Sequence, residues 1–480
     1  MAEDKIINFD EKKKELKAEI EYEINRDDDL DDVLGDVIDN VDFGNQKRLA
    51  WMNERHAVIN DYFGRTAIVA WQYDPVANKK VMSFRTKESF QIQYLNQTMP
   101  LGEKTIDMAT WWLKSVGRKE YETVIFDPSK PREYKKCLNL WEGTSVQPKK
   151  GSWKKTKWHI YNILCNRDKI KFRYFMKWLA WCIQNPSERA EVAVIFKGRE
   201  GAGKGFIFSQ MLKIYGKHGM AISNREQLTG KFNAHFRTLV FLFADEAYYP
   251  GDKSVEGVLK QIITEPTFAA EGKGEQVRSV RNCLHIGMST NNDWVIPASG
   301  DSRRFFINQV DNAYSRSLLA DSVRKIYFNA LWGEMDNGGR EAMLYDLQHL
   351  KLNGWHPRDD VPTTDELKHQ ITLNMPKPNK LVLDLLDGGI FPGEKNPTLG
   401  YIATAKELKD YFEEISPDNK VPFLPIANIL HALGLEKRTI KNSRCWTFYS
   451  LGTMRKRWVD NYGDYAFDQK EAWELKNPNF

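Results

Sequence analysis

Three short apolar runs mark the middle of the chain, and glycine or polar residues follow each of them. The runs are EVAVIF at 191–196, LVFLF at 239–243 and CLHIGM at 283–288. Uninterrupted apolar runs of this length are typical of strands buried on both faces, as in a parallel sheet. Because helix-like segments separate them, the pattern predicts an α/β core with a parallel sheet over residues 191–312.

The segments on either side of this core follow other patterns. Apolar residues are too sparse in residues 1–42 for a packed core, whereas strand-like runs such as TAIVAW at 66–71 alternate with turns farther on. The last hundred or so residues read as helices closed by a strand. We therefore predict five flanking parts: an acidic arm (1–42), a mixed and partly helical N-terminal collar domain (43–145), a basic helical segment (146–190), a helical lid (313–375) and a helical, winged-helix-like C-terminal domain (376–480).

Charge is distributed unevenly along the 480 residues, whose formal net charge is +5. Residues 1–42 contain 16 acidic and 6 basic side chains, and the rest of the chain contains 49 acidic and 64 basic ones. A basic body suits a partner that carries phosphates. The acidic arm is then either a competitor for the same surface or a simple solubilising tail.

Other sequence signals exclude several classes of protein. No apolar run approaches the roughly 18 residues of a membrane span, and the charged start lacks the apolar stretch of a secretory signal. The five cysteines are scattered without CxxC spacing, which argues against a disulfide framework or a zinc knuckle. We expect a soluble, cytoplasmic protein with no membrane partner.

Residues 147–180 form a strongly basic stretch, with ten Lys or Arg, including Lys154 and Lys155, and a single acid, Asp168. Seven aromatic residues are interleaved with these charges. Lysines neutralise phosphates and aromatic faces stack on bases, so one interpretation is a nucleic-acid surface. The other is a pair of amphipathic helices whose aromatics form core, because Phe172, Phe175 and Trp178 recur at helical spacing. The sequence leaves both open.

A glycine-rich loop follows the first apolar run and precedes the helix-like stretch FIFSQMLKIYG. Its residues match G-x-x-x-x-G-K, in which glycines let backbone N–H groups converge on phosphate oxygens and the lysine reaches the outer phosphates. The predicted phosphate-binding residues are Gly198, Gly201, Ala202, Gly203, Lys204 and Gly205. The last of these departs from the pattern, because a Ser or Thr hydroxyl normally binds Mg²⁺ there. Ser209 is one candidate substitute.

Two further groups of polar residues follow apolar runs. Asp245 and Glu246 end the second run, where one carboxylate would hold Mg²⁺ and the other would activate a water. Asn291 ends the third run and would sense the γ-phosphate and the attacking water. Downstream, Arg303 and Arg304 are candidate arginine fingers that act on a neighbouring subunit's ATP.

A glycine-flanked lysine lies between these motifs, in the segment EGKGEQVRSVR at 271–281. The pattern predicts a hairpin with Lys273 at its tip and Arg278 on the returning strand. Such a lysine, repeated around a ring, would grip successive phosphates of single-stranded DNA. A simple exposed turn is the alternative.

The ordered motifs GREGAGKG, LVFLFADEA, EGKGEQVRSVRN, MSTNNDW and DSRRFF resemble the superfamily 3 helicase core, and in particular the helicase domain of phage primase-polymerases. The likeness extends over residues 120–370. It implies an AAA+-like P-loop ATPase, ATP and Mg²⁺ as ligands, a hexameric ring, and translocation on single-stranded or forked DNA during phage-type DNA replication in the host cytoplasm. It also implies roles for Lys204, Asp245, Glu246, Asn291, Lys273 and the arginine pair Arg303 and Arg304 in these activities.

Alternative functions share the same core. Because Gly205 removes a hydroxyl, a nucleotide switch that binds DNA without turnover is one alternative. A packaging or protein-remodelling motor is another, since fold does not fix function. No primase site is apparent, so we expect a separate primase or polymerase as a partner.

Overall fold

The computed structural model describes residues 45–75, 79–101, 104–230, 233–246, 253–273, 275–293, 304–417, 422–440, 442–463, 465 and 467–476. The predicted acidic arm and Arg303 lie outside these residues. Two compact units are present, and the first ends at Val124 and takes in Lys135–Cys137. The predicted boundary at residue 145 is thus later than the end of the first unit.

The first unit is a small α/β structure built on antiparallel strands. Strand β1 pairs with β2 antiparallel and with β6 in parallel, and β2 pairs with β3. One face of these strands buries Val58 and Ile68 against Trp112 and Phe90 of the helices. The elements are α3 (Asn45–Arg55), β1 (His56–Tyr62), β2 (Arg65–Asp74), β3 (Lys79–Arg85), α4 (Lys87–Tyr94), β4 (Thr98–Leu101), β5 (Lys104–Asp107), α5 (Met108–Lys114) and β6 (Glu120–Ile125).

The second unit contains the predicted parallel sheet. Its strand order is β10-β11-β14-β9-β15, and every neighbouring pair is parallel. The strands are β9 (Ala193–Lys197), β10 (Gly219–Ile222), β11 (Phe241–Asp245), β14 (His285–Thr290) and β15 (Phe305–Gln309). All three apolar runs thus form strands, and the prediction of a mixed α/β core with a parallel sheet is confirmed.

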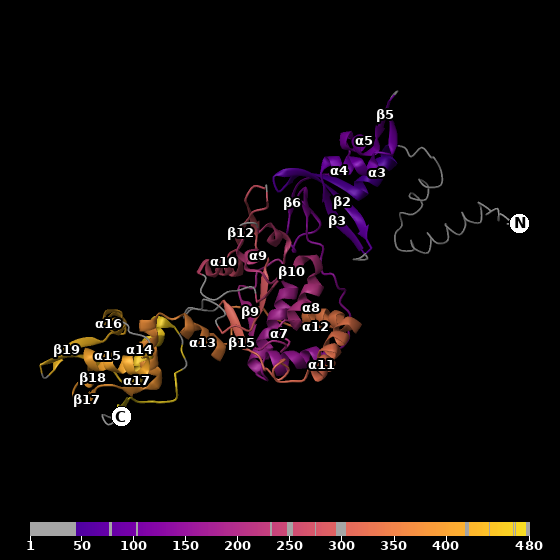
Figure 1. The fold of residues 1–480 in the computed structure, drawn as a ribbon. Helices are drawn as coiled ribbons and strands as arrows, with labels where there is room; N and C mark the ends of the chain where they lie inside the picture. Colours follow the sequence, from indigo (N-terminus) through magenta and orange to yellow (C-terminus); the bar gives the residue numbers. More distant parts are fainter. Residues whose placement is uncertain are drawn as a thin grey trace. The chain divides into compact units, whose positions relative to one another are not determined.

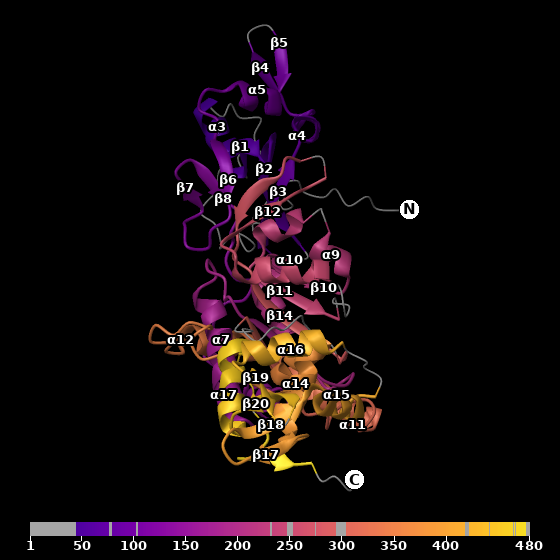
Figure 2. The same ribbon diagram turned by 90° about the vertical axis from the view of Figure 1, so that its left-hand side faces the viewer.

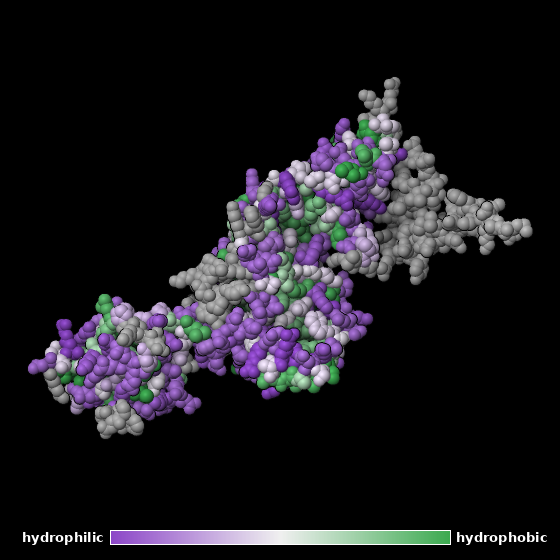
Figure 3. All heavy atoms as spheres, in the orientation of Figure 1, coloured by the Kyte–Doolittle hydropathy of each residue, from purple (hydrophilic) through white to green (hydrophobic). Residues whose placement is uncertain are grey.

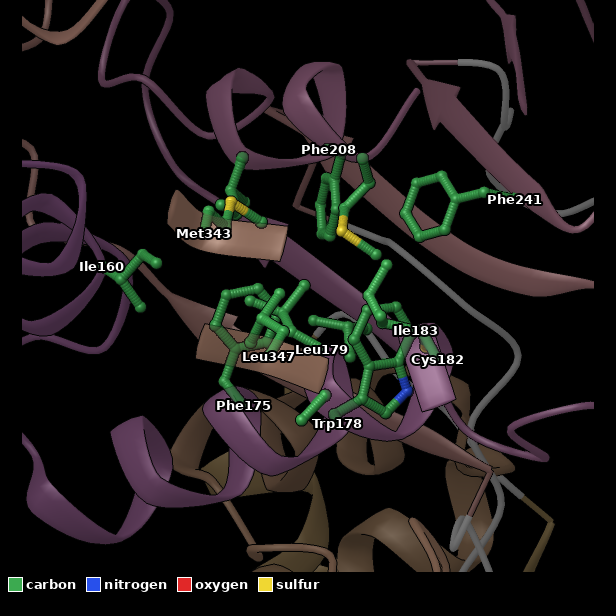
Figure 4. Packing of buried hydrophobic residues seen from close by; sticks show 14 of the residues in the cluster. Ile160, Phe175, Trp178, Leu179, Cys182, Ile183, Phe208, Phe241, Met343 and Leu347 are labelled. Atoms are coloured by element: carbon green, nitrogen blue, oxygen red, sulfur yellow. The ribbon is translucent and has the colours of Figure 1, made fainter. Parts of the chain in front are cut away.

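Helices cover both faces of this sheet, so that each strand is buried on two sides. Alternate residues of β9 point to opposite faces, with Val194 and Phe196 in one apolar cluster and Ile195 in the other. Figure 4 shows part of the first cluster, where Phe208, Trp178 and Leu179 pack together. The helices are α7 (Lys169–Gln184), α8 (Phe206–Tyr215), α11 (Asp321–Glu334) and α12 (Arg340–His349) on the first face, and α9 (Arg225–Thr229), α10 (Lys253–Thr264) and α13 (Asp365–Asn374) on the second.

Helix α13 is fixed to the sheet by a buried ion pair. Lys197 Nζ, on the last residue of β9, lies 3.0 Å from Glu366 Oε1, and both side chains are only 9% exposed. The Thr364 hydroxyl, at the start of the helix, donates to the carbonyl of Ile307 on β15. The region predicted as a helical lid is therefore helical, and its last helix is attached directly to the sheet.

The basic segment resolves into helices, and four of its seven aromatic residues are buried. Helix α6 (Lys154–His159), the π-helical turn η1 (Ile160–Leu164) and α7 follow one another. Trp153, Phe175 and Trp178 are fully buried and Tyr174 nearly so. These rings cannot stack on bases, so the interleaved nucleic-acid surface is wrong for them, and for these four residues the interpretation as helix core is correct; Trp158 is 47% exposed.

The remaining elements are a hairpin and a C-terminal group with its own apolar core. The hairpin pairs β12 (Thr267–Ala270) with β13 (Arg278–Arg281) (Figure 2). In the C-terminal group an antiparallel sheet of order β17-β18-β20-β19 packs against helices around Trp446, Leu430 and Trp458. Its elements are α14 (Lys377–Gly388), β16 (Ile390–Phe391), β17 (Glu394–Asn396), β18 (Gly400–Thr404), α15 (Ala405–Ile415), α16 (Phe423–Ala432), β19 (Glu436–Ile440), β20 (Ser443–Phe448), α17 (Leu451–Tyr462) and β21 (Glu474–Leu475) (Figure 1).

Five short elements complete the part of the chain that the structure describes. They are β7 (Glu133–Tyr134), β8 (Cys137–Asn139), the 3₁₀ turns η2 (Gly216–His218) and η3 (Ala234–Thr238), and the π-helical turn η4 (Met335–Gly339) between α11 and α12. Among the described residues, no helix combines the length and apolar character that crossing a bilayer requires.

Candidate functional site

The glycine-rich loop joins the carboxyl end of β9 to the start of α8, as the sequence predicts. Gly201 and Gly203 have φ of +79° and +87°, a left-handed conformation that strongly favours glycine. A Cβ at Gly203 would also lie 2.7 Å from His159 Cε1, so no larger residue fits. The ten-residue α8 directs its N-terminal N–H groups toward this loop, an arrangement that attracts anions.

Lys204 reaches back across the loop that contains it. Its ammonium donates to the carbonyl oxygens of Gly198 at 2.7 Å and Arg199 at 2.9 Å. The residue is 8% exposed, and this burial lowers the pKa of Lys204, while the nearby carboxylates of Glu246 and Asp245 act in the opposite direction. A buried cation thus lies at the centre of the loop, beside two carboxylates.

These two carboxylates stand at the carboxyl end of β11. Asp245 is the last residue of the strand, pairs in register with Ser289 of β14, and accepts a hydrogen bond from the Ser289 hydroxyl. Glu246 follows with φ of +52°, and its N–H donates to the Ser289 carbonyl at 3.0 Å. Left-handed backbone is uncommon for a residue with a Cβ and is concentrated at functional sites. Both carboxylates are exposed at the edge of the sheet.

Asn291 lies at the same edge, directly after β14, and is exposed. It lines an open cleft of about 580 Å³. The other residues of the cleft are Arg199, Glu200, Asn292, Arg316 and Ser317. The loop, the two carboxylates and the predicted sensor amide therefore share one edge of the parallel sheet, where ligands of such sheets bind.

Several residues of this region carry no sequence signal. Arg316 N–H donates to the Glu200 carbonyl at 3.0 Å, and its guanidinium pairs with the Glu200 carboxylate. A Cβ at Gly201 would lie 2.8 Å from Arg324 Nη2, so a second arginine borders the loop. Both come from the segment after β15, more than a hundred residues from the loop, and only the fold brings them there.

His159 is another such residue, behind the loop. Its Nε2 lies 3.2 Å from the Gly203 carbonyl oxygen and its Nδ1 lies 2.7 Å from the Tyr327 hydroxyl. Burial lowers the pKa of His159 to about 4, so the ring is neutral at neutral pH and able to accept or donate one hydrogen bond at each nitrogen. It supports the loop from α6, which the sequence marked only as basic.

The remaining predicted residues lie away from the cleft. Arg304 directly precedes β15, whose first residue pairs with the first residue of β9. Because β9 and β15 are parallel, Arg304 stands at the amino edge of the sheet, roughly 20 Å along the strands from the loop. Lys273 is exposed in the turn between β12 and β13, Arg278 begins β13, and Lys154 and Lys155 are exposed on α6.

The hairpin is held firmly where β12 leads into its turn. Arg237, which is 5% exposed, pairs with Glu275 and donates to the Ala270 carbonyl. The Asn233 side chain accepts from the Glu271 N–H and donates to the Ala269 carbonyl. The exposed Lys273 is thus presented on a fixed support.

The oxygen donors at the cleft edge fit a hard divalent cation. Among the residues that the structure describes, no three His, Cys, Asp or Glu side chains form a metal cluster. Mg²⁺, however, is usually held by one or two carboxylates, waters and substrate phosphates, and Asp245 and Glu246 provide such carboxylates. Ser209, the substitute considered from the sequence, instead donates to the Gly205 carbonyl at 3.0 Å within α8.

Comparison with known proteins relates this chain to a phage protein. A family described as of unknown function (DUF5906) matches residues 196–304, which include the loop and both carboxylates. The DNA primase-polymerase of Nitratiruptor phage NrS-1 is 26% identical over 217 residues, 43% of this chain and 30% of the relative. This chain is thus homologous to part of a phage primase-polymerase and spans 30% of its length.

Solved structures extend the likeness beyond the aligned sequence. An apo structure of the NrS-1 C-terminal region has a TM-score of 0.59 at 19% identity and covers 83% of this chain and 97% of that one. An A-form apo structure of the same region has a TM-score of 0.58 over the same shares. The chain shares the fold of that C-terminal region.

Proposed function

We propose that this chain is an ATP-driven ring helicase that moves on single-stranded DNA and unwinds duplex in phage-type DNA replication. One observation carries the proposal. Lys204 is enclosed in a glycine loop at a helix N-terminus, and the Asp245 and Glu246 carboxylates stand at the end of the strand two places away in the sheet. The relationship to a phage DNA primase-polymerase supports a role in DNA replication.

The residues of the cleft have distinct tasks in this proposal. Lys204 and the loop residues Gly198 and Gly201 to Gly205 would hold the phosphates of ATP. Glu246 would accept a proton from the water that attacks the γ-phosphorus, as the bond to the bridging oxygen breaks and ADP and phosphate form. Asn291 would orient that water. Asp245 would hold Mg²⁺, which neutralises charge on the phosphates when bound.

Two features of this chain support the proposed ring, which we expect to be a hexamer. Arg304 is too far along the strands to serve the loop of its own chain, so it is suited to act on ATP held by a neighbour, with Arg303 as the alternative. An apolar surface lies next to the cleft, since Leu318, Val323 and Ile326 are 59%, 48% and 71% exposed. Figure 3 shows hydrophobic residues at the edge of the core where Figure 1 places α11. Exposed apolar patches of this kind mark protein interfaces.

The strand order β10-β11-β14-β9-β15 supports the AAA+-like core that the sequence resemblance implies. In the C-terminal group, α14, β18, α15, α16 and the β19–β20 hairpin follow one another as in a winged helix. The exposed Lys273, with Arg278, would grip the DNA backbone from the β12–β13 hairpin, and Lys154 and Lys155 would add charge. A separate primase or polymerase would be a further partner.

The proposal is tested by ATP hydrolysis measured with and without single-stranded DNA, together with unwinding of a forked duplex. We expect DNA to stimulate hydrolysis and the Lys204→Ala variant to lose it, because the loop then lacks its phosphate-binding charge. Lys351→Ala removes an exposed lysine after α12 and is the matched control.

Other outcomes distinguish the alternatives. Nucleotide binding without hydrolysis, with or without DNA, would favour a nucleotide switch, which the missing hydroxyl at Gly205 makes a specific candidate. Hydrolysis without strand separation would favour a packaging or remodelling motor on the same core.

A further inference from the structure

The structure explains why residue 205 is glycine, although the loop pattern normally has Ser or Thr there. A Cβ built on Gly205 would lie 2.8 Å from Phe243 Cζ and 3.4 Å from Phe243 Cε1. Phe243 is 5% exposed and packs against Phe208, with ring centroids 5.4 Å apart. Because a buried, packed ring cannot move aside cheaply, a side chain that carries a hydroxyl is excluded at this position.

A different hydroxyl lies next to the same spot. Ser289 Oγ is 3.8 Å from the Cβ position of Gly205, and Ser289 is 3% exposed. Ser289 comes from β14, which lies between β9 and β11 in the sheet. The neighbouring strand β14 therefore places a hydroxyl beside position 205, where the loop itself has none.

The hydrogen bond that this hydroxyl donates leaves it able to bind a metal ion. Ser289 Oγ donates its proton to Asp245 Oδ1, which leaves both of its oxygen lone pairs available. In P-loop enzymes a hydroxyl from the loop and a carboxylate from a neighbouring strand hold the same Mg²⁺. Here Ser289 and Asp245 stand in register on adjacent strands, so the two oxygens are already paired. Ser209 is not equivalent, since its hydroxyl donates to the Gly205 carbonyl.

We propose that Ser289 supplies the Mg²⁺-binding hydroxyl that Gly205 lacks, so that metal-bound nucleotide is held by Asp245 and Ser289. This inference rests on the proposed nucleotide site. It also removes the main argument for a non-hydrolysing switch, because the missing loop hydroxyl is replaced by one from β14.

Metal binding without turnover provides the test. The full chain is loaded with a non-hydrolysable ATP analogue, and Mn²⁺ is titrated while free Mn²⁺ is followed by electron paramagnetic resonance. In Ser289→Ala we expect the Mn²⁺ affinity of the nucleotide complex to fall about tenfold or more, with unchanged affinity for the analogue in the absence of metal. Ser209→Ala, also a hydroxyl deletion beside the loop, should match wild type.

A sulfur substitution separates ligation from a structural role. Ser289→Cys places a softer ligand at the same position, so binding of the analogue should be supported by Cd²⁺ in preference to Mg²⁺. A purely structural serine would show no such change in metal preference. Circular dichroism of each variant establishes that it is folded.

Three results would overturn the inference or its premise. If Ser289→Ala is folded and binds Mn²⁺ as wild type does, Ser289 is not a ligand. If Ser209→Ala loses metal affinity instead, the loop helix supplies the hydroxyl. If the wild-type chain binds no nucleotide under any metal condition, the proposed function fails, and that failure is distinct from either of the others.

Discussion

The carbonyl oxygen of Gly203 lies 3.2 Å from Nε2 of His159, and the other nitrogen of the same ring lies 2.7 Å from the Tyr327 hydroxyl. Three parts of the chain far apart in sequence, α6, the glycine loop and α11, thus meet at one buried imidazole. The ring is neutral at neutral pH in this environment, because burial lowers the pKa of His159 to about 4. Protonation of His159 at low pH will therefore destabilise the contact that supports the loop, in addition to the protonation of groups at the surface.

This buried histidine predicts acid sensitivity. The pKa of His159 is about 4 in the folded chain against an ordinary 6.5, so between these values only the unfolded chain takes up a proton, and stability falls as the pH drops. We expect His159 to contribute a loss of about 2 kcal/mol between pH 7 and pH 5. The free energy of unfolding is measured in urea at pH 7 and at pH 5. The difference between the two values should be smaller in His159→Gln than in wild type. In the exposed His349→Gln it should stay as in wild type, and an undiminished difference in His159→Gln would contradict the prediction.

A pair of glycine substitutions tests the backbone requirement of the loop. In Gly203→Ala the new Cβ meets His159 at 2.7 Å with φ of +87°, so we expect a loss of about 2–4 kcal/mol in the free energy of unfolding. Gly333 in α11 has nothing within 4 Å of its Cβ position. Gly333→Ala should therefore raise stability by about 0.5–1 kcal/mol. Denaturant unfolding of both variants should give opposite shifts, and shifts of the same sign would contradict the model of the loop.

The hairpin lysine predicts a change in the salt dependence of DNA binding. A plot of log affinity against log salt concentration has a negative slope. If Lys273 contacts one phosphate, Lys273→Ala makes this slope shallower by about 0.7 per subunit on single strands. Fluorescence anisotropy with a labelled oligonucleotide at several salt concentrations measures this slope. Lys351→Ala should leave it unchanged. An unaltered slope in Lys273→Ala would mean that the hairpin tip is a simple exposed turn.

The placement of Arg304 predicts complementation between inactive chains. Lys204→Ala removes the phosphate lysine and Arg304→Ala removes the proposed finger, so each pure variant should hydrolyse little ATP. Mixing them creates interfaces in which an intact Lys204 meets an intact Arg304 from the next subunit. Hydrolysis should then rise above the average of the two pure variants. No rise in mixtures shown to exchange subunits would mean that Arg304 does not act on ATP held by a neighbour.

Much of the core was predictable from local pattern, because buried parallel strands are continuous apolar runs and the phosphate loop is a contiguous motif. The strands containing Val194, Phe241 and Ile286 were found this way. The short β10 was not, since only Ile222 of its four residues is fully buried. The order of the strands in the sheet could not be predicted from local pattern either, because each pairing joins segments many residues apart.

Residues that act through tertiary contact left no local signal. Ser289 is one polar residue at a strand end, and its significance emerges only when Phe243 is seen to fill the space beside Gly205. His159 and Arg324 likewise reach the loop from distant helices. The basic segment left two interpretations open, a surface for bases or helices with an aromatic core, and only the fold shows that residues such as Trp178 are core.

The ion pair between Lys197 and Glu366 has a consequence for communication along the chain. Lys197 immediately precedes Gly198, and α13, which carries Glu366, leads into the C-terminal group. Helix α13, which joins that group to the sheet, is therefore attached one residue before the loop that would bind ATP. If nucleotide binding shifts the loop, Lys197 and its ion pair with Glu366 connect that shift directly to the helix that leads into the C-terminal group.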